Sequence, residues 1–156
     1  MKLSAKARYA LRLMVEIARD QGGKAVSLGK VSEKSKISRR YLDQVAGGLK
    51  QAALLNSTSG RGGGYRLTRP AGEIRLGQIV EAAIGPINIV DCVQHPDLCI
   101  KADMCECRSV YALMNRRITE ALNEYSLAEL ADREQLRQLC QVGGLMDVDG
   151  FSCPTT

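Results

Sequence analysis

The chain has 156 residues, of which 45% are hydrophobic, and a net charge of +5. This length allows one compact domain or a small domain with an appendage. One Phe, five Tyr and no Trp leave an aliphatic core, which favours helices. Arg12 and Glu16 interrupt the first apolar stretch, and no run approaches the length of a membrane span. We therefore expect a cytoplasmic protein without membrane contact.

The charge is divided unevenly along the chain. Residues 1–75 contain 16 Lys and Arg against 5 Asp and Glu, a net +11, whereas residues 76–156 contain 6 against 12, a net −6. This asymmetry favours a nucleic-acid-binding end joined to an end with another task. A solvated basic surface would give the same count, so the charge alone does not decide.

Three helices are predicted in the basic half. Apolar residues recur at helical spacing over residues 5–19, with Ser4 as N-cap. A short helix follows over about 28–36, and Ser38 caps a third that runs to Lys50. Two short helices joined by a tight turn, the second polar and basic at its start, indicate a helix-turn-helix.

The third helix carries the side chains expected to read DNA in the major groove. Arginine pairs with guanine or phosphate, Gln with adenine and Asp with cytosine, whereas Ser38 and Tyr41 are better suited to phosphates. Any one of them taken singly could be only a solvated side chain. The predicted DNA-binding residues on and beside this helix are Ser38, Arg39, Arg40, Tyr41, Asp43, Gln44 and Lys50.

A glycine-rich segment after this helix predicts a β-hairpin. Residues 54–59 predict a strand, and residues 60–67 predict a glycine-rich turn followed by a second strand; the turn contains Arg61, Gly62 and Gly63. A hairpin directly after a helix-turn-helix is a wing. An arginine at its tip suits a narrow minor groove, so these three residues join the DNA-binding set, although a plain surface hairpin is the alternative.

Beyond the wing the pattern changes. A short amphipathic helix is predicted around residues 76–83, then an irregular loop over 85–107, a long helix over about 107–125 and a last helix over Leu127–Leu139. The long helix has an apolar face that no other segment obviously covers, so a partner subunit is expected to cover it. Its members are Val110, Leu113, Met114, Ile118, Ala121, Leu122 and Tyr125.

The expected fold is mainly α with a small β-hairpin wing: a winged helix-turn-helix plus a long dimerisation helix. The expected domains are residues 1–75 for DNA binding and 76–140 for the bridging helix, cysteine loop and dimerisation helix. Residues 141–156 are expected to form a disordered tail.

The loop contains four of the six cysteines, at Cys92, Cys99, Cys105 and Cys107. Thiols in this number and spacing can wrap an inorganic centre, either an iron–sulfur cluster or structural zinc. The spacing lacks the paired C-x2-C motifs of zinc ribbons. Cys107 can equally be a small buried residue, because residues two apart on a helix point nearly opposite ways. His95 is better interpreted as a solvated loop residue than as a ligand.

These residues together resemble the Rrf-two (Rrf2) family of winged-helix transcription regulators, and most closely its IscR-like iron–sulfur type. The resemblance extends from Met1 to about Leu130. It is carried by the start Lys2–Ala10, the segment Ile37–Gln44, the wing Gly62–Leu67 and the three spaced cysteines.

The resemblance implies a homodimer on a palindromic operator of double-stranded DNA. It also implies a cluster on Cys92, Cys99 and Cys105 that controls DNA affinity in response to iron, redox or nitric oxide status. Either a 2Fe–2S or a 4Fe–4S form is compatible, and the 2Fe–2S form is preferred here.

The sequence departs from the family pattern in three places. The family's fourth ligand, a histidine three residues after the last cysteine, is replaced by Arg108. The N-terminal acid that some relatives lend to the partner's cluster is replaced by Arg8, and the first cysteine gap is one residue longer. Cys107 is the predicted fourth ligand, with His95 or an exogenous group as the next candidates.

Two alternatives stay open. The same regulator could use its cysteines for zinc or for direct oxidation, without a cluster. An electron carrier or redox enzyme is the other class, but the chain shows no nucleophile–base pair and has one histidine. We therefore expect no enzyme and no small-molecule substrate.

Overall fold

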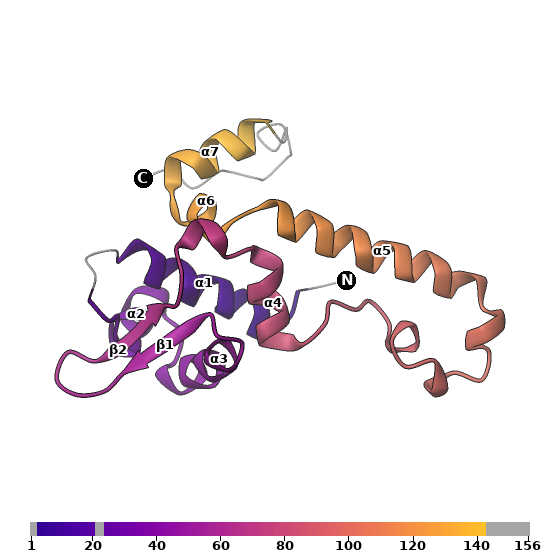
Figure 1. The fold of residues 1–156 in the computed structure, drawn as a ribbon, viewed down its shortest axis with the longest axis horizontal. Helices are drawn as coiled ribbons and strands as arrows, with labels where there is room; N and C mark the ends of the chain where they lie inside the picture. Colours follow the sequence, from indigo (N-terminus) through magenta and orange to yellow (C-terminus); the bar gives the residue numbers. More distant parts are fainter. Residues whose placement is uncertain (1–2, 21–23, 143–156) are drawn as a thin grey trace.

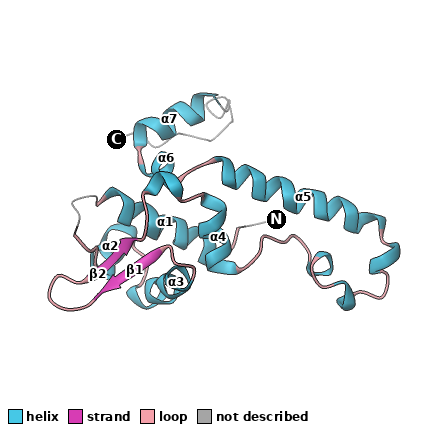
Figure 2. Cartoon of the chain, viewed as in Figure 1, coloured by secondary structure: helices cyan, strands magenta, loops and turns pink. Residues whose placement is uncertain are grey.

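The computed structural model describes residues 3–20 and 24–142. The ribbon is mainly helical with one antiparallel hairpin, which confirms the predicted fold class (Figures 1 and 2). The helices are α1 Ala5–Arg19, α2 Leu28–Ser35, α3 Arg39–Gln51, α4 Leu76–Ile84, α5 Glu106–Glu124, α6 Leu127–Ala131 and α7 Arg133–Val142. The strands are β1 Leu55–Thr58 and β2 Gly64–Leu67.

Helix α1 lies at the centre of the core. Ser4 caps its start, because its hydroxyl accepts a hydrogen bond from the Ala7 N–H at 3.2 Å. Its apolar side packs against α3, α4 and α6. The buried residues of α1 are Ala7, Ala10, Leu13, Met14, Ile17 and Ala18.

Helix α4 links the winged half to the rest of the chain. Leu76, Ile79, Val80 and Ala83 are buried, as the amphipathic pattern predicts. The chain then leaves the body, passes through the cysteine loop and returns along α5, which projects as an arm (Figure 1). At its return, the Leu76 N–H donates to Tyr125 O and the Leu127 N–H donates to Ile74 O.

The helix predicted over Leu127–Leu139 is divided in two. The Asp132 backbone is extended, and its carboxylate accepts hydrogen bonds from the N–H groups of Glu134 and Gln135 at 2.8 and 3.1 Å. Asp132 therefore begins a new helix in the middle of the predicted one, because a short acidic side chain competes with the backbone for these donors. Residues 143–156 of the predicted tail lie outside the described residues, whereas Gln141 and Val142, which also belong to the predicted tail, are the last residues of α7.

Candidate DNA interface and cysteine loop

The turn between α2 and α3 is tight. Lys36 takes a left-handed conformation with φ of 57°, and its N–H donates to Ser32 O at 2.9 Å. Ile37 is buried behind the turn. Ser38 then caps α3 by accepting a hydrogen bond from the Tyr41 N–H at 3.4 Å. These contacts fix the angle at which α3 leaves the turn.

Helix α3 presents two distinct faces. Leu42, Val45, Ala46 and Leu49 are buried, as the sequence predicts. The four side chains predicted to reach base edges, Arg39, Arg40, Asp43 and Gln44, all lie exposed on the other side. The helix therefore offers two cations, a carboxylate and an amide to a ligand in solvent.

Two predicted DNA-binding residues also have structural contacts. The half-buried Tyr41 ring meets the Tyr9 ring edge-on, with centroids 5.2 Å apart, which joins α3 to α1. The Lys50 ammonium donates to the Ser57 hydroxyl at 2.8 Å, which joins α3 to the wing. The first contact therefore orients α3 against α1, and the second links α3 to β1 of the wing.

The wing is a four-pair hairpin that runs from Leu55 opposite Leu67 to Thr58 opposite Gly64. At its tip the Gly63 N–H donates to Gly60 O at 2.9 Å, which leaves Arg61 exposed on the projecting turn. Gly62 has φ of 82°, a conformation that side chains disfavour. The backbone therefore presents Arg61 as the sequence predicts.

The base of the wing is attached to the body by a further bridge. Val26 and Tyr65 exchange two backbone hydrogen bonds, each 2.9 Å long. Gly64 lies so close to this segment that an added Cβ would be 2.3 Å from Val26 O. Only glycine fits here without a backbone shift, so the wing's position depends on Gly64.

A hollow of about 340 Å³ separates α3 from the wing. Arg39 and Asp43 line one side of it, and Ser57 and Thr58 line the other, together with Ser27 at the start of α2. These three hydroxyl residues were not among the predicted site residues. Their signals are a helix N-cap position and a polar strand next to a basic helix.

Two lysines of α2 are engaged elsewhere. Lys30 hydrogen-bonds to Asp20, and this contact lowers the pKa of the Asp20 carboxyl. Lys34 Nζ lies 3.4 Å from Glu16 Oε2. The basic surface that faces a ligand is therefore carried by α3 and the wing more than by α2.

The cysteine loop is a chain of short 3₁₀ turns at the far end of the arm. Cys92 lies in the turn Asp91–Val93, Cys99 follows Pro96–Leu98, and Cys105 follows Ala102–Met104 and begins α5. All three are half-buried free thiols. In the described part of the chain, no group of three or more metal-ligating side chains is gathered closely enough to hold an ion.

The other candidate ligands lie apart from this set. Cys107 is exposed on α5, where helical spacing places it on the face of Val110 and Met114. His95 is exposed, and Cys140 is buried in α7. Cys153 lies outside the described residues.

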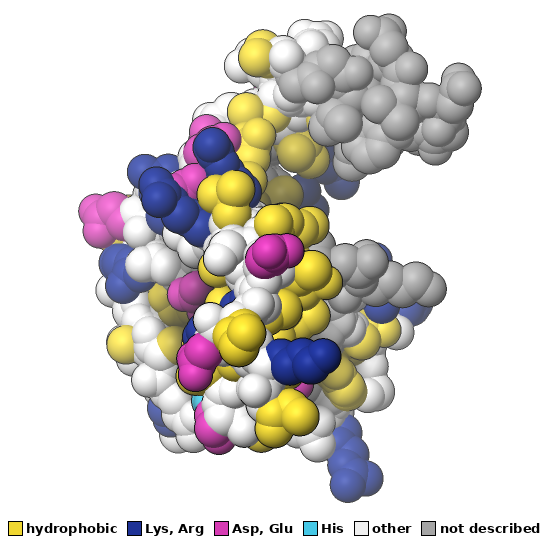
Figure 3. Space-filling view, turned by 90° about the vertical axis from the view of Figure 1, so that its right-hand side faces the viewer, with side chains coloured by type: hydrophobic (Ala, Val, Ile, Leu, Met, Phe, Trp, Pro, Cys, Tyr) yellow, Lys and Arg dark blue, Asp and Glu magenta, His cyan; other side chains and the backbone are white. Residues whose placement is uncertain are grey.

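The apolar face of α5 is largely uncovered. Val110, Leu113 and Met114 are 55, 54 and 45% exposed. Figure 3 views the molecule from the end that carries the cysteine loop and the start of α5, and it shows hydrophobic side chains gathered among scattered charges. In the loop itself, Leu98, Ile100 and Met104 also reach solvent. Nothing in the described chain covers this surface.

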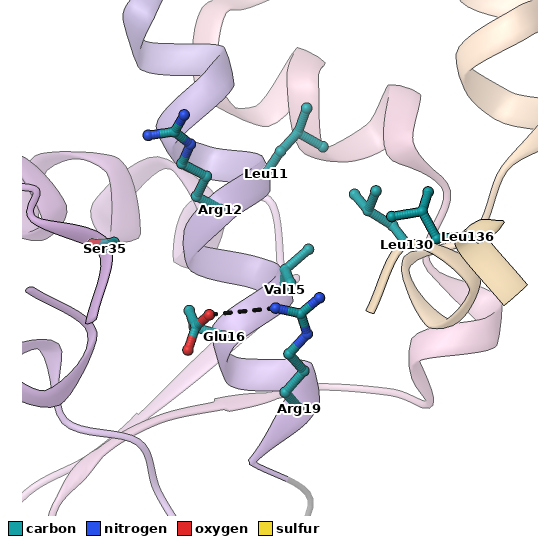
Figure 4. Close-up of a pocket in the computed structure, with 8 residues that line it drawn as sticks. All are labelled: Leu11, Arg12, Val15, Glu16, Arg19, Ser35, Leu130 and Leu136. Atoms are coloured by element: carbon teal, nitrogen blue, oxygen red, sulfur yellow. Dashed lines mark ion pairs between the residues drawn. The ribbon is translucent and has the colours of Figure 1, made fainter. Parts of the chain in front are cut away.

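A pocket of about 470 Å³ lies between α1 and the α6–α7 pair (Figure 4). Leu11 and Val15 of α1 line it opposite Leu130 and Leu136. Glu16, at its edge, pairs with Arg19 at 3.7 Å. Arg12 and Ser35 complete its lining. None of the described helices is long and apolar enough to cross a membrane.

Comparison with known proteins identifies the family. Residues 3–133 match the model of the Rrf2 family, described as an iron-dependent transcriptional regulator. The HTH-type transcriptional regulator IscR of Sodalis glossinidius is 34% identical over 136 residues, which cover 87% of this chain and 82% of that protein.

Two solved structures are similar. CymR of B. subtilis, titled the global cysteine regulator, has a TM-score of 0.67 and 30% identity, covering 84% of this chain and 96% of that one. IscR of T. potens has a TM-score of 0.64 and 26% identity, covering 96% and 94%. With its winged helix-turn-helix and a match over most of its length, this chain belongs to the Rrf2 family of transcriptional regulators.

Proposed function

We propose that this chain binds a palindromic operator as a homodimer and that the state of its cysteine loop sets its affinity for DNA. The observation that carries the proposal is the placement of three half-buried thiols at one end of the molecule and a basic helix with its wing at the other. Since its target is DNA, we infer that the protein works in the cytoplasm.

The roles at the DNA follow from the chemistry of each side chain. Arg39, Arg40, Asp43 and Gln44 read base edges from α3, and Arg61 enters the minor groove from the wing. Ser38 and Tyr41 position α3 on phosphates, and Lys50 holds the wing beside it. Ser27 and Ser57 are further hydroxyl donors for phosphate at the hollow.

The sensed group that we propose is an iron–sulfur cluster, with the 2Fe–2S form preferred. The donor chemistry fits, because Cys92, Cys99 and Cys105 are half-buried thiols on one irregular loop. When bound, the cluster would supply a centre that responds to oxidants, iron supply or nitric oxide. These three cysteines would hold it.

A fourth ligand must come from elsewhere than position 108, because a guanidinium has no lone pair for a metal. Cys107 stays our first candidate by its thiol chemistry, although α5 carries it on the apolar face. His95 or an exogenous group is the next. Loading would therefore require local rearrangement at the start of α5.

The route from the loop to the DNA-binding half runs through α5. Cys105 is the N-cap of this helix, and the other end of α5 meets the start of α4 through the Leu76–Tyr125 hydrogen bond. Helix α4 packs against α1 and α3. Ordering or releasing the loop can therefore shift α5 and the spacing of two recognition helices in a dimer.

The homodimer is supported by the uncovered apolar face of α5. An exposed stripe of large aliphatic residues on one long helix is typical of a subunit interface. A second copy would bury this stripe and bring two α3 helices into two-fold symmetry. Half-sites about one or two helical turns apart would follow from this symmetry.

A second candidate keeps the regulator but replaces the cluster by zinc or by oxidation of the thiols. One observation favours the oxidation form over either metal: the described loop does not gather three or more metal-ligating side chains around a common point. The similarity to CymR, a cysteine regulator by its title, is compatible with it.

Anaerobic purification separates the two candidates. Visible absorption with matched counts of iron and sulfide is expected for the wild-type chain, and Cys92→Ala, Cys99→Ala or Cys105→Ala should each remove the colour. Cys140→Ala is the control and should keep it. A colourless protein that contains zinc or no metal would contradict the cluster.

A further inference from the structure

Arg108 hydrogen-bonds to the backbone of the turn that contains Cys92. Its Nε donates to Cys92 O at 3.0 Å, and its Nη2 donates to Val93 O at 3.3 Å. The side chain is half-buried between α5 and the loop. A planar guanidinium can satisfy two neighbouring carbonyls at once, which a histidine at this position cannot do.

Arg108 also lies between the turn that contains Cys92 and the segment that contains Cys105. It lines a pocket of about 260 Å³ together with Val93 from the first of these and Ala102 and Cys105 from the second. Its contacts therefore tie the loop's first turn to the point where α5 begins.

A second set of hydrogen bonds to the same segment lies seven residues further along the helix. The Asn115 amide donates to Asn88 Oδ1 at 2.6 Å, and its oxygen accepts from the Ile89 N–H at 2.9 Å. Asn115 is only 8% exposed, in a helix whose other described residues are more exposed. Residues seven apart share one face of a helix, so α5 hydrogen-bonds to the segment 88–93 at two points on that face.

We infer that Arg108 and Asn115 form a polar clip that fixes the start of the cysteine loop to α5. Arg108 is then a positioning residue: it does not bind the sensed group but holds the backbone of Cys92. A change at Cys92 must either move α5 with it or break the clip. The inference rests on the proposed function in treating the loop as the input.

Hydrogen exchange in the metal-free, reduced full-length chain tests the clip without any cluster. The His95 N–H, which donates to Asp91 O at 2.9 Å, reports on the first turn. In Arg108→Ala this amide should exchange about tenfold faster, as expected for losing hydrogen bonds from a charged donor. Arg108→Lys should fall between, since its ammonium keeps a charged donor but lacks the planar fork that reaches both carbonyls.

Arg116→Ala is the matched control. Arg116 lies on the same helix and hydrogen-bonds to Glu120 at 2.6 Å, so its loss removes a similar contact away from the loop. Exchange at His95 should match wild type there. Unchanged exchange in Arg108→Ala, with α5 still helical by circular dichroism, would overturn the clip.

A double-mutant cycle on operator affinity tests the transmission. Cys92→Ser should change affinity in the wild-type chain and change it several-fold less in Arg108→Ala, because the broken clip no longer carries the change. Equal effects in both backgrounds would overturn transmission through Arg108. If Cys92→Ser has no effect in wild type, the proposed function fails while the exchange result still decides the clip.

Discussion

Arg61 and Gly64 have separate roles in the wing. Arg61 is presented to a ligand by glycines on either side, whereas Gly64 holds the hairpin against Val26. One can be altered without touching the other. Binding and positioning can therefore be measured apart.

Arg61→Ala should weaken binding to operator DNA by roughly 1–3 kcal/mol if the arginine enters a groove. Stability should not change, because the side chain is exposed. Fluorescence anisotropy with labelled operator measures the affinity. Arg117→Ala, an exposed cation on α5, should bind like wild type, and equal affinity for Arg61→Ala would exclude the groove contact.

Gly64→Ala should destabilise the wing. Its φ of 157° and the 2.3 Å approach to Val26 O force the backbone to move. We expect a cost of about 1–3 kcal/mol in the free energy of unfolding and weaker DNA binding. Gly72→Ala, where a Cβ meets nothing within 4 Å, is the control in urea unfolding. A Gly64→Ala chain as stable as that control would contradict the close packing.

Among the elements, the sequence predicted helices and hairpin well because their patterns are local. Ser4, Ser27 and Ser38 each cap the helix that follows, and Leu42, Val45 and Leu49 face the core as their spacing indicates. The break at Asp132 was missed. There a side-chain hydrogen bond competes with an otherwise continuous helical pattern.

The candidate site was predictable only in part. Residue type and spacing identify the exposed face of α3 and the three thiols. The contacts of Arg108 with the Cys92 and Val93 carbonyls depend on how the loop folds back across α5, 15–16 residues apart in sequence. No local pattern encodes such a contact, so it could not be predicted from the sequence.

The capping box that begins α6 gives a pH-dependent prediction. The hydrogen bonds of Ser126, first from its hydroxyl and then from its backbone N–H, lower the pKa of Glu129. A lowered pKa stabilises the fold above the carboxyl's ordinary value of 4.5, and the effect is lost as pH falls through the lowered value.

Ser126→Ala should therefore cost about 1 kcal/mol near neutral pH and less in acid. Urea unfolding at neutral pH and near the acid limit of the fold measures the difference. Glu129→Gln is the control: it has no carboxyl at this position, so the part of the pH dependence of unfolding that comes from Glu129 should be absent in this variant. A Ser126→Ala cost that stays constant or grows in acid would contradict the cap.

At the scale of the whole molecule, the two halves differ in charge and in place. The basic residues 1–75 carry α3 and the wing, and the acidic remainder carries the loop at the opposite end (Figure 1). In the proposed complex, the net +11 of residues 1–75 would draw that half toward DNA, and the acidic remainder would be repelled by the phosphates.

The assembly can be tested on the apolar face of α5. Met114→Glu should convert the proposed dimer to a monomer, because it places a charge in a desolvated interface. Sedimentation velocity measures the change. Arg116→Glu places the same side chain on the opposite side of the helix and should leave the dimer intact. A wild-type chain that sediments as a monomer would contradict the homodimer.

The most direct test of coupling between the cysteine loop and the DNA-binding half is operator affinity at fixed salt. It is measured once with the iron–sulfur cluster loaded on the loop and once with the cluster removed. We predict that the operator affinities of the two forms differ by about 5- to 150-fold, the usual range for linked sites. We also predict that the affinity of a chain with Cys92, Cys99 and Cys105 all replaced by serine does not respond to the same treatment. Equal affinity of the loaded and emptied wild-type forms would contradict the coupling between the cysteine loop and the DNA-binding half.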